Sequence, residues 1–182
     1  EGRVVGLFAG IGGIERGLGQ AGHEAVLLCE NLPAAQAVLD ERFDGVRKHD
    51  DVCTLKALPR GTQLLTAGFP CQDLSQAGKT AGISGKNSGL VGQVFRLLEK
   101  SRVPWVLLEN VPFMLQLSRG RALEVIIKAL EQLGYQWAYR VVNSRSFGVP
   151  QRRERVFLVA SLKENPCDVL LRSEEHTSEL QS

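Results

Sequence analysis

Short apolar runs of strand length alternate with helical segments along most of this 182-residue chain. The runs typical of strands lie at residues 3–8, 24–28, 46–52, 63–67, 105–108, 135–142 and 155–160, and the helical segments at residues 14–20, 33–43, 90–100 and 122–133. Strands that alternate with helices form a mostly parallel sheet with right-handed crossovers. The pattern therefore predicts an α/β fold, and the chain length favours a single core.

Acidic or sulfur-bearing residues stand at the ends of four of these strands, namely Glu30, Asp51, Cys71 and Glu109. Taken singly, Glu30 is more often a solvated or helix-capping residue, and Glu109 is as well explained by a strand that ends at solvent. However, the carboxyl ends of parallel strands lie at one edge of the sheet, where open α/β sheets bind ligands. We therefore expect the four side chains to form one site.

Cys71 follows Gly68 and Pro70, which end the preceding strand. A free cysteine is most often a small buried hydrophobic residue. Residues 73–89 are too polar and glycine-rich to be buried, and long loops of this kind are usually functional. This position favours a nucleophilic role for Cys71.

A glycine turn, Gly10 to Gly13, joins the first strand to the first helix. Glycines let the backbone approach a ligand and leave amide groups free to bind an anionic group. The turn is not a full dinucleotide fingerprint, because Glu15 occupies the position of the third glycine. Glu30, at the end of the second strand, is placed to accept both hydroxyls of a ribose.

The cysteine spacing, the N-terminus and the length of the apolar runs argue against a metal site, a signal peptide and a membrane span. The four cysteines have no CxxC spacing and few histidines nearby, so we expect no metal site. The N-terminus does not resemble a signal peptide, and no apolar run approaches membrane-spanning length. We therefore expect a cytoplasmic protein with reduced thiols and no membrane partner.

Four motifs occur in the order and spacing of the cytosine-5 DNA methyltransferases. They are Phe8-Ala9-Gly10-Ile11-Gly12-Gly13, Gly68-Phe69-Pro70-Cys71-Gln72, Glu109-Asn110-Val111 and Gln151-Arg152-Arg153-Glu154-Arg155. The chain resembles this family from Val4 to about Ala160. The resemblance implies a Rossmann-like, S-adenosylmethionine-dependent methyltransferase fold with a mixed, mostly parallel sheet. Its last strand is expected to lie antiparallel beside the fifth.

The resemblance also implies S-adenosylmethionine as the methyl donor and assigns residues to its pocket. The matching positions are Phe8, Gly10, Ile11 and Gly13 around the methionine part, Glu30 and the adjoining Asn31 at the ribose, Asp51 and Val52 at the adenine, and Pro70 and Leu90 further along the lining.

In the reaction that the resemblance implies, Cys71 attacks carbon 6 of a cytosine flipped out of the duplex. Carbon 5 is not nucleophilic enough to take a methyl group until a thiolate has added next to it. Glu109 would hold N3 and the exocyclic amine, and Arg155 would hold the O2 oxygen. Arg153 would support the Cys71 region or a nearby phosphate.

The chain departs from the family near its end. Relatives continue with a target-recognition region and a segment that completes the donor pocket, so we expect residues 1–171 to be an incomplete catalytic domain. Residues 172–182, RSEEHTSELQS, resemble a translated sequencing-library adapter and are expected to be a non-native tail. Without them 21 basic and 17 acidic residues remain, a net charge of +4 that suits a nucleic-acid partner.

The expected partner is double-stranded DNA, with a cognate restriction endonuclease in the same bacterial, phage or archaeal system. Three alternatives stay open at this point. A non-catalytic or regulatory relative would lack the recognition region, and a tRNA cytosine methyltransferase shares most of these motifs. A nicotinamide-dependent dehydrogenase would leave Pro70-Cys71-Gln72 unexplained.

Overall fold

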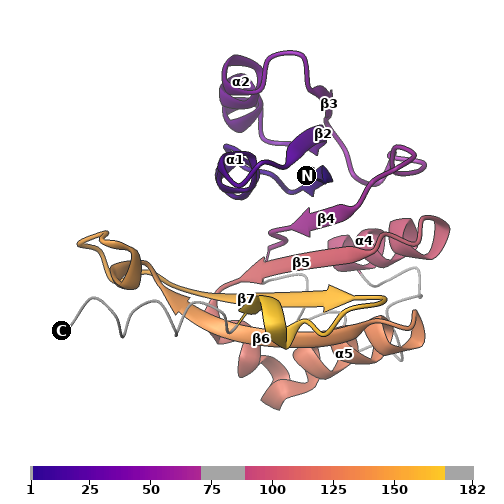
Figure 1. The fold of residues 1–182 in the computed structure, drawn as a ribbon, viewed down its shortest axis with the longest axis vertical. Coiled ribbons are helices and arrows are strands. Elements are labelled where there is room, and N and C mark those ends of the chain that lie inside the picture. The colour runs from indigo at the N-terminus through magenta and orange to yellow at the C-terminus, as the bar shows by residue number, and fades with distance from the viewer. Residues whose placement is uncertain (1, 71–88, 171–182) are drawn as a thin grey trace.

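The computed structural model describes residues 2–70 and 89–170, which form a seven-stranded sheet with the strand order β3-β2-β1-β4-β5-β7-β6 (Figure 1). The strands are β1 (Arg3–Leu7), β2 (Glu24–Cys29), β3 (Arg47–His49), β4 (Leu64–Ala67), β5 (Trp105–Asn110), β6 (Gln136–Asn143) and β7 (Glu154–Ser161). The α-helices are α1 (Gly13–Gln20), α2 (Pro33–Arg42), α4 (Gly89–Lys100), α5 (Arg121–Gln132) and α6 (Cys167–Leu170), and the short 3-10 turns are η1 (Pro112–Leu115), η2 (Leu117–Gly120) and η3 (Ser144–Phe147).

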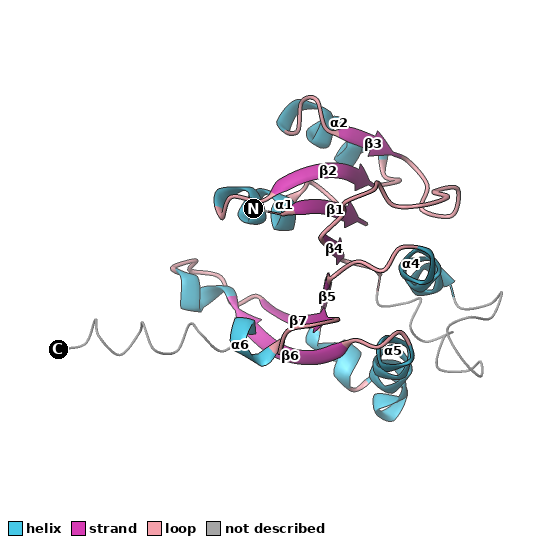
Figure 2. Cartoon of the chain, turned by 45° about the vertical axis from the view of Figure 1, so that its right-hand side comes forward, coloured by secondary structure: helices cyan, strands magenta, loops and turns pink. Residues whose placement is uncertain are grey.

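The strand directions confirm the predicted fold class. Strands β1 to β5 pair in parallel, whereas β7 runs antiparallel to both of its neighbours, β5 and β6. Helices α1 and α2 lie on one side of the sheet, and α4 and α5 lie on the other (Figure 2). The sheet is therefore mixed and doubly wound, with the antiparallel strand inserted beside the fifth as expected.

Alternating burial along β5 explains how the sheet is covered. Val106, Leu108 and Asn110 are buried, whereas the residues between them are partly exposed. Helix α5 buries one stripe at helical spacing, Ala122, Ile126 and Leu130. One cluster of buried apolar side chains runs across the sheet as a continuous core. The carboxyl ends of β1, β2, β4 and β5 are thereby fixed relative to one another.

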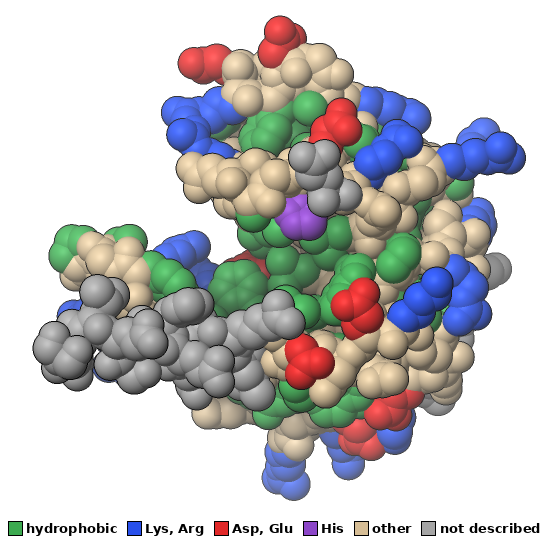
Figure 3. Space-filling model, viewed as in Figure 1, with side chains coloured by type: hydrophobic (Ala, Val, Ile, Leu, Met, Phe, Trp, Pro, Cys, Tyr) green, Lys and Arg blue, Asp and Glu red, His purple; other side chains and the backbone are tan. Residues whose placement is uncertain are grey.

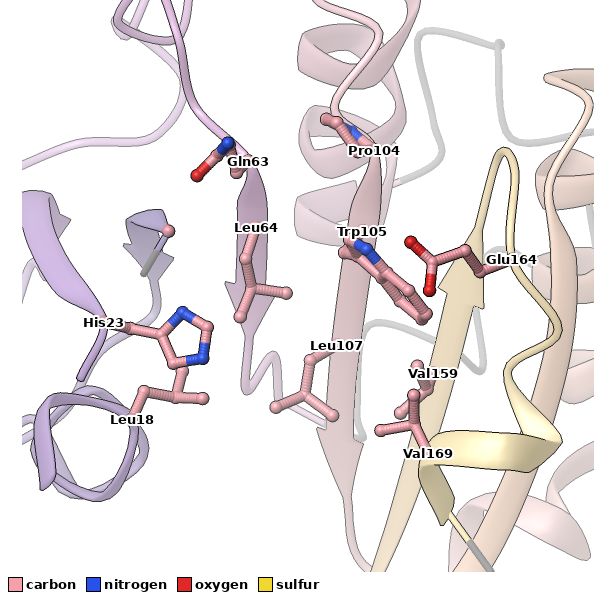
Figure 4. Close-up of a pocket in the computed structure, with 11 residues that line it drawn as sticks. Leu18, His23, Gln63, Leu64, Pro104, Trp105, Leu107, Val159, Glu164 and Val169 are labelled. Atoms are coloured by element: carbon pink, nitrogen blue, oxygen red, sulfur yellow. The ribbon is translucent and has the colours of Figure 1, made fainter. Parts of the chain in front are cut away.

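The other face of β4, β5 and β7 carries an open apolar hollow of about 610 Å³ (Figures 3 and 4). Leu64, Trp105, Leu107 and Val159 point into it, and His23 lies at its border (Figure 4). The hollow extends toward the amino ends of the strands. It is therefore separate from the edge at which the candidate residues were predicted to meet.

One local prediction was too long. The strand expected at residues 46–52 is only β3, because a turn follows it in which Asp51 accepts a hydrogen bond from the Cys53 amide. The helix expected at residues 122–133 is α5, with Gly120 at its cap position. After β3, a short-range turn thus replaces the regular structure that the local sequence favoured.

Several predictions fall on residues outside the described ranges. They are the nucleophile Cys71, the loop after it, and the tail at residues 172–182 together with its boundary after residue 171. Across residues 2–70 and 89–170, no helix is long and apolar enough to cross a membrane.

Candidate active site

The carboxyl ends of four neighbouring strands meet at one edge of the sheet. The Ala9 amide donates to the Cys29 carbonyl at 3.1 Å, and the Gly68 amide donates to the Leu7 carbonyl at 3.4 Å. Ala67 is paired with Leu108, one residue before Glu109. The segments that carry Gly10, Glu30, Pro70 and Glu109 are thus adjacent, as predicted from the strand ends.

The glycine turn has a backbone that few residues other than glycine adopt. Gly10 and Gly12 have φ of 56° and 80°, and Phe8 has a φ of 53° despite its side chain. A Cβ added at Gly10 or Gly13 would meet no described atom within 4 Å. The turn therefore borders open space and presents its backbone to it, which fits an approaching ligand.

Glu30 connects this turn to the end of β2. Its Oε2 accepts a hydrogen bond from the Gly10 amide at 2.8 Å, and its Oε1 accepts one from the Leu32 amide at 2.9 Å. The Gln36 side chain donates to the Glu30 carbonyl at 2.6 Å. Each carboxylate oxygen can accept a second hydrogen bond, so Glu30 can position the turn and still bind hydroxyl groups.

The residues expected at the adenine lie just beyond β3. Asp51 is exposed, with Oδ1 occupied by the Cys53 amide at 2.8 Å, and Val52 is buried. Asn31 is exposed next to Glu30. The Glu30 amide donates to the His49 carbonyl at 3.0 Å, so the end of β3 that leads to Asp51 lies beside Glu30.

Neither of the cysteines near this region is a suitable nucleophile. Burial, followed by the charges of Asp51 and Glu30, raises the pKa of the Cys29 thiol to about 12. Burial also raises the pKa of the Cys53 thiol. Both thiols stay protonated near neutral pH, so they do not compete with Cys71 for this role.

Asn110 joins the end of β5 to the segment that leads to the predicted nucleophile. It is 5% exposed, and its amide Nδ2 donates to the Phe69 carbonyl at 2.9 Å, while its Oδ1 accepts from the Val111 amide at 2.8 Å. Asn110 lies in one of the four motifs, but the sequence alone predicts no role for it. In β5, partly exposed and buried residues alternate, and Asn110 is a polar residue at a buried position. That mismatch is the signal that could have identified it.

Glu109 and Arg155 form an ion pair at the same edge. Arg155 Nε lies 3.0 Å from Glu109 Oε1, with 23% and 22% of the two side chains exposed. Glu109 is paired with Phe157 across the antiparallel strands, so Arg155 is its diagonal neighbour. A Cβ at Gly68 would lie 3.1 Å from Glu109 Oε2, so the glycine provides room for the carboxylate.

The remaining predicted residues are mostly exposed. Arg153 is exposed, and its carbonyl accepts from the Ser144 amide at 2.9 Å across the β6–β7 hairpin. Pro70 is exposed, Leu90 is half-buried at the start of α4, and Ile11 is 63% exposed. Within the described ranges, no three metal-binding side chains come together.

Comparisons with known proteins agree on one family. The family model described as C-5 cytosine-specific DNA methylase matches residues 2–182. Type II methyltransferase M2.BsuMI of Bacillus subtilis (strain 168) is 53% identical over 179 residues, covering 96% of this chain and 46% of the relative. Type II methyltransferase M.MspI of Moraxella sp is 36% identical over 166 residues, covering 90% of this chain and 39% of the relative.

A solved structure supports the same fold. The crystal structure of S. pombe Dnmt2 methyltransferase has a TM-score of 0.71 at 23% identity, over 91% of this chain and 52% of that one. The chain thus spans about half the length of the proteins that it matches.

Proposed function

Because the chain belongs to the C-5 cytosine-specific DNA methylase family, we propose that it is the catalytic part of an enzyme that methylates carbon 5 of cytosine in double-stranded DNA. The observation that carries this proposal is the Glu109–Arg155 pair, placed beside the segment that leads to Cys71. Family membership rules out the dehydrogenase alternative.

The glycine turn and Glu30 fit S-adenosylmethionine, which would supply an electrophilic methyl group. The open space at Gly10 and Gly13 accommodates the methionine part without a side chain in the way. Glu30 retains acceptor capacity for the ribose hydroxyls, and Asp51 and Val52 border the place of the adenine. Phe8, Ile11, Asn31, Pro70 and Leu90 complete the proposed lining.

The Glu109–Arg155 pair matches one edge of cytosine. That edge presents the O2 acceptor, the N3 position and the exocyclic amine side by side. A guanidinium donates to O2, while a carboxyl group a few ångströms away holds N3 and accepts from the amine. The base must leave the duplex to reach these groups, because its edge and faces are otherwise covered.

Cys71 is the proposed nucleophile. Its thiolate adds to carbon 6, and the negative charge that develops toward N3 and O2 is neutralised by Glu109 and Arg155. Carbon 5 then takes the methyl group, a base removes the carbon 5 proton, and the thiolate leaves. Asn110 donates to the Phe69 carbonyl at 2.9 Å, which fixes the segment before Cys71 to the end of β5. Arg153 is a candidate phosphate contact.

The choice of DNA rests on the relatives' names. Both of the relatives compared above are named Type II methyltransferases, which supports DNA as the substrate and a cognate restriction endonuclease as a further partner. A tRNA substrate and a non-catalytic, donor-binding role are the alternatives. The intact Glu109–Arg155 pair favours catalysis over binding alone.

The proposal is tested by methyl transfer under single-turnover conditions, with the chain in excess over the nucleic acid so that slow transfer is still detected. Mixed-sequence duplex DNA and tRNA are each incubated with S-adenosylmethionine tritiated in the methyl group. We expect label in 5-methylcytosine from the digested DNA. Label confined to tRNA would favour the RNA alternative, and donor binding without label would favour the non-catalytic one.

Replacing Glu30 with alanine is expected to weaken S-adenosylhomocysteine binding by tens to hundreds of fold. The variant loses two charge-assisted hydrogen bonds to the ribose, which are worth on the order of 2 to 4 kcal/mol together. The variant also removes the hydrogen-bond acceptor of the Gly10 amide. Calorimetric titration measures the affinity, with Glu24→Ala at the exposed start of β2 as the matched control. Unchanged affinity in Glu30→Ala would refute the placement of the ribose.

A further inference from the structure

Glu15 is a buried acidic residue that the proposed reaction does not use. It lies in the first turn of α1, directly after the glycine turn, and only 4% of it is exposed. Its Oε1 lies 2.5 Å from the hydroxyl of Thr66, a fully buried residue of β4. Its Oε2 is buried and has no hydrogen-bond partner among the described residues.

The backbone of β1 leaves room for this carboxyl group. A Cβ added at Gly6 would lie 2.5 Å from Glu15 Oε1, closer than a non-bonded carbon and oxygen can approach. The carboxyl group thus lies against β1, which leads to the glycine turn, and is bonded to β4, which leads to Gly68 and Pro70. It connects the two segments that the proposed function assigns to the donor and to the nucleophile.

Counting hydrogens indicates which form of Glu15 fits this position. Thr66 Oγ1 is 2.5 Å from Glu15 Oε1 and 3.4 Å from the Val5 carbonyl, but a hydroxyl has one hydrogen to donate. If Glu15 carries a proton, it donates to Thr66 and leaves the Thr66 hydrogen for Val5. The unpartnered Oε2 is then a neutral carbonyl oxygen, which costs far less to bury than a charged one.

The surroundings favour the same form. Burial raises the pKa of Glu15, and this effect outweighs the hydrogen bond from Thr66. A second hollow, distinct from the apolar one over β4, β5 and β7, is lined by Glu15 and by charged or titratable groups of neighbouring elements, Arg3, Arg16, His23, Glu24 and Asp44. Within the described ranges, none of these forms an ion pair with Glu15 within 4.0 Å.

We propose that Glu15 is a positioning residue whose neutral carboxyl group fastens the glycine turn, through α1, to the strand that leads to Cys71. This inference rests on the proposed function, which gives the glycine turn to the methyl donor; the hydrogen bond from Glu15 holds that turn against β4, which leads to Gly68 and Pro70. The third glycine of the dinucleotide fingerprint, whose position Glu15 occupies, lets the helix pack closely against the strand, whereas Glu15 joins the helix to β4 by a hydrogen bond.

Three variants of the full 182-residue chain separate this role from simple filling of space. Glu15→Gln keeps the shape and can donate to Thr66 without a charge, so it should behave like the wild type near neutral pH. Glu15→Ala and Thr66→Val each remove one partner of the hydrogen bond. Gln20→Ala, on the exposed surface of the same helix, is the matched control.

The first readout is amide hydrogen exchange in the glycine turn. The Gly12 amide bonds the Ala9 carbonyl at 2.8 Å, and the Arg16 amide bonds the Gly12 carbonyl at 2.9 Å. We expect both to exchange about tenfold faster in Glu15→Ala and Thr66→Val, the change expected for one lost buried hydrogen bond. S-adenosylhomocysteine affinity should fall by a similar factor, and Glu15→Gln should restore both.

The second readout is the titration of Glu15, followed by carbon-13 resonances of its side-chain carboxyl group and assigned by their loss in Glu15→Gln. A carboxyl group whose pKa is raised by folding stabilises the fold below its unfolded pKa, and this contribution is lost as the pH rises through the folded pKa. Glu15→Gln cannot titrate, so its stability relative to the wild type should increase as the pH rises through the folded pKa of Glu15.

Titration of Glu15 together with the exposed carboxyl groups would overturn the proposal. Unchanged exchange in both Glu15→Ala and Thr66→Val would also overturn it. A wild-type chain that binds no S-adenosylhomocysteine would instead count against the proposed function, while the exchange and titration measurements would still decide the role of Glu15.

Discussion

Replacing Cys71 with serine is expected to abolish cytosine methylation while leaving donor binding intact. A hydroxyl is far less ionised than a thiol near neutral pH, so addition to carbon 6 should slow by on the order of 10⁴-fold or more. Single-turnover transfer of tritium measures the rate, and calorimetry with S-adenosylhomocysteine measures donor binding. Retained methyl transfer in this variant would contradict the assignment of the nucleophile.

A covalent trap identifies the reacting sulfur directly. With 5-fluorocytosine in duplex DNA, the adduct should persist after methyl transfer, because fluorine cannot leave as the proton does. Intact-mass measurement should detect this adduct in the wild type and in Cys167→Ser, a matched control in α6, but not in Cys71→Ser. An adduct that maps to Cys29 or Cys53 would conflict with the protonated state that their raised pKa values indicate.

Replacing Glu109 with glutamine is expected to lower the rate of the chemical step by about 10²- to 10⁴-fold, the usual contribution of a positioned acid or base. Glutamine keeps the size of the side chain but cannot supply a proton to N3, and it also removes the ion pair with Arg155. The single-turnover rate at saturating donor and DNA measures this loss separately from binding.

Glu124→Gln provides the matched control for this substitution. Glu124 is exposed on α5, where it pairs with Lys128 four residues further on and has no contact with Glu109 or Arg155 among the described ion pairs. Its replacement should leave the rate unchanged. A Glu109→Gln enzyme as fast as this control would show that Glu109 is not the proton donor.

The strand ends were predictable because the information that specifies them is local. Apolar runs of four to six residues such as β4 and β5 are recognisable one at a time, and the residue that follows each run marks its end. Parallel pairing then brings the ends together without any knowledge of the side-chain contacts. The turn after β3 was missed, since Asp51 specifies a turn that competes with the regular pattern.

The sequence alone determined the α/β class, the antiparallel last strand beside the fifth that the family resemblance implies, and the candidate residues at the carboxyl edge. The tertiary structure decided how those residues are held. Glu30 bonds Gly10 across 20 positions, Asn110 bonds Phe69 across 41, and Thr66 bonds Glu15 across 51. Such contacts depend on the strand register and on the side to which each side chain points, and a shift of one residue would reverse that side.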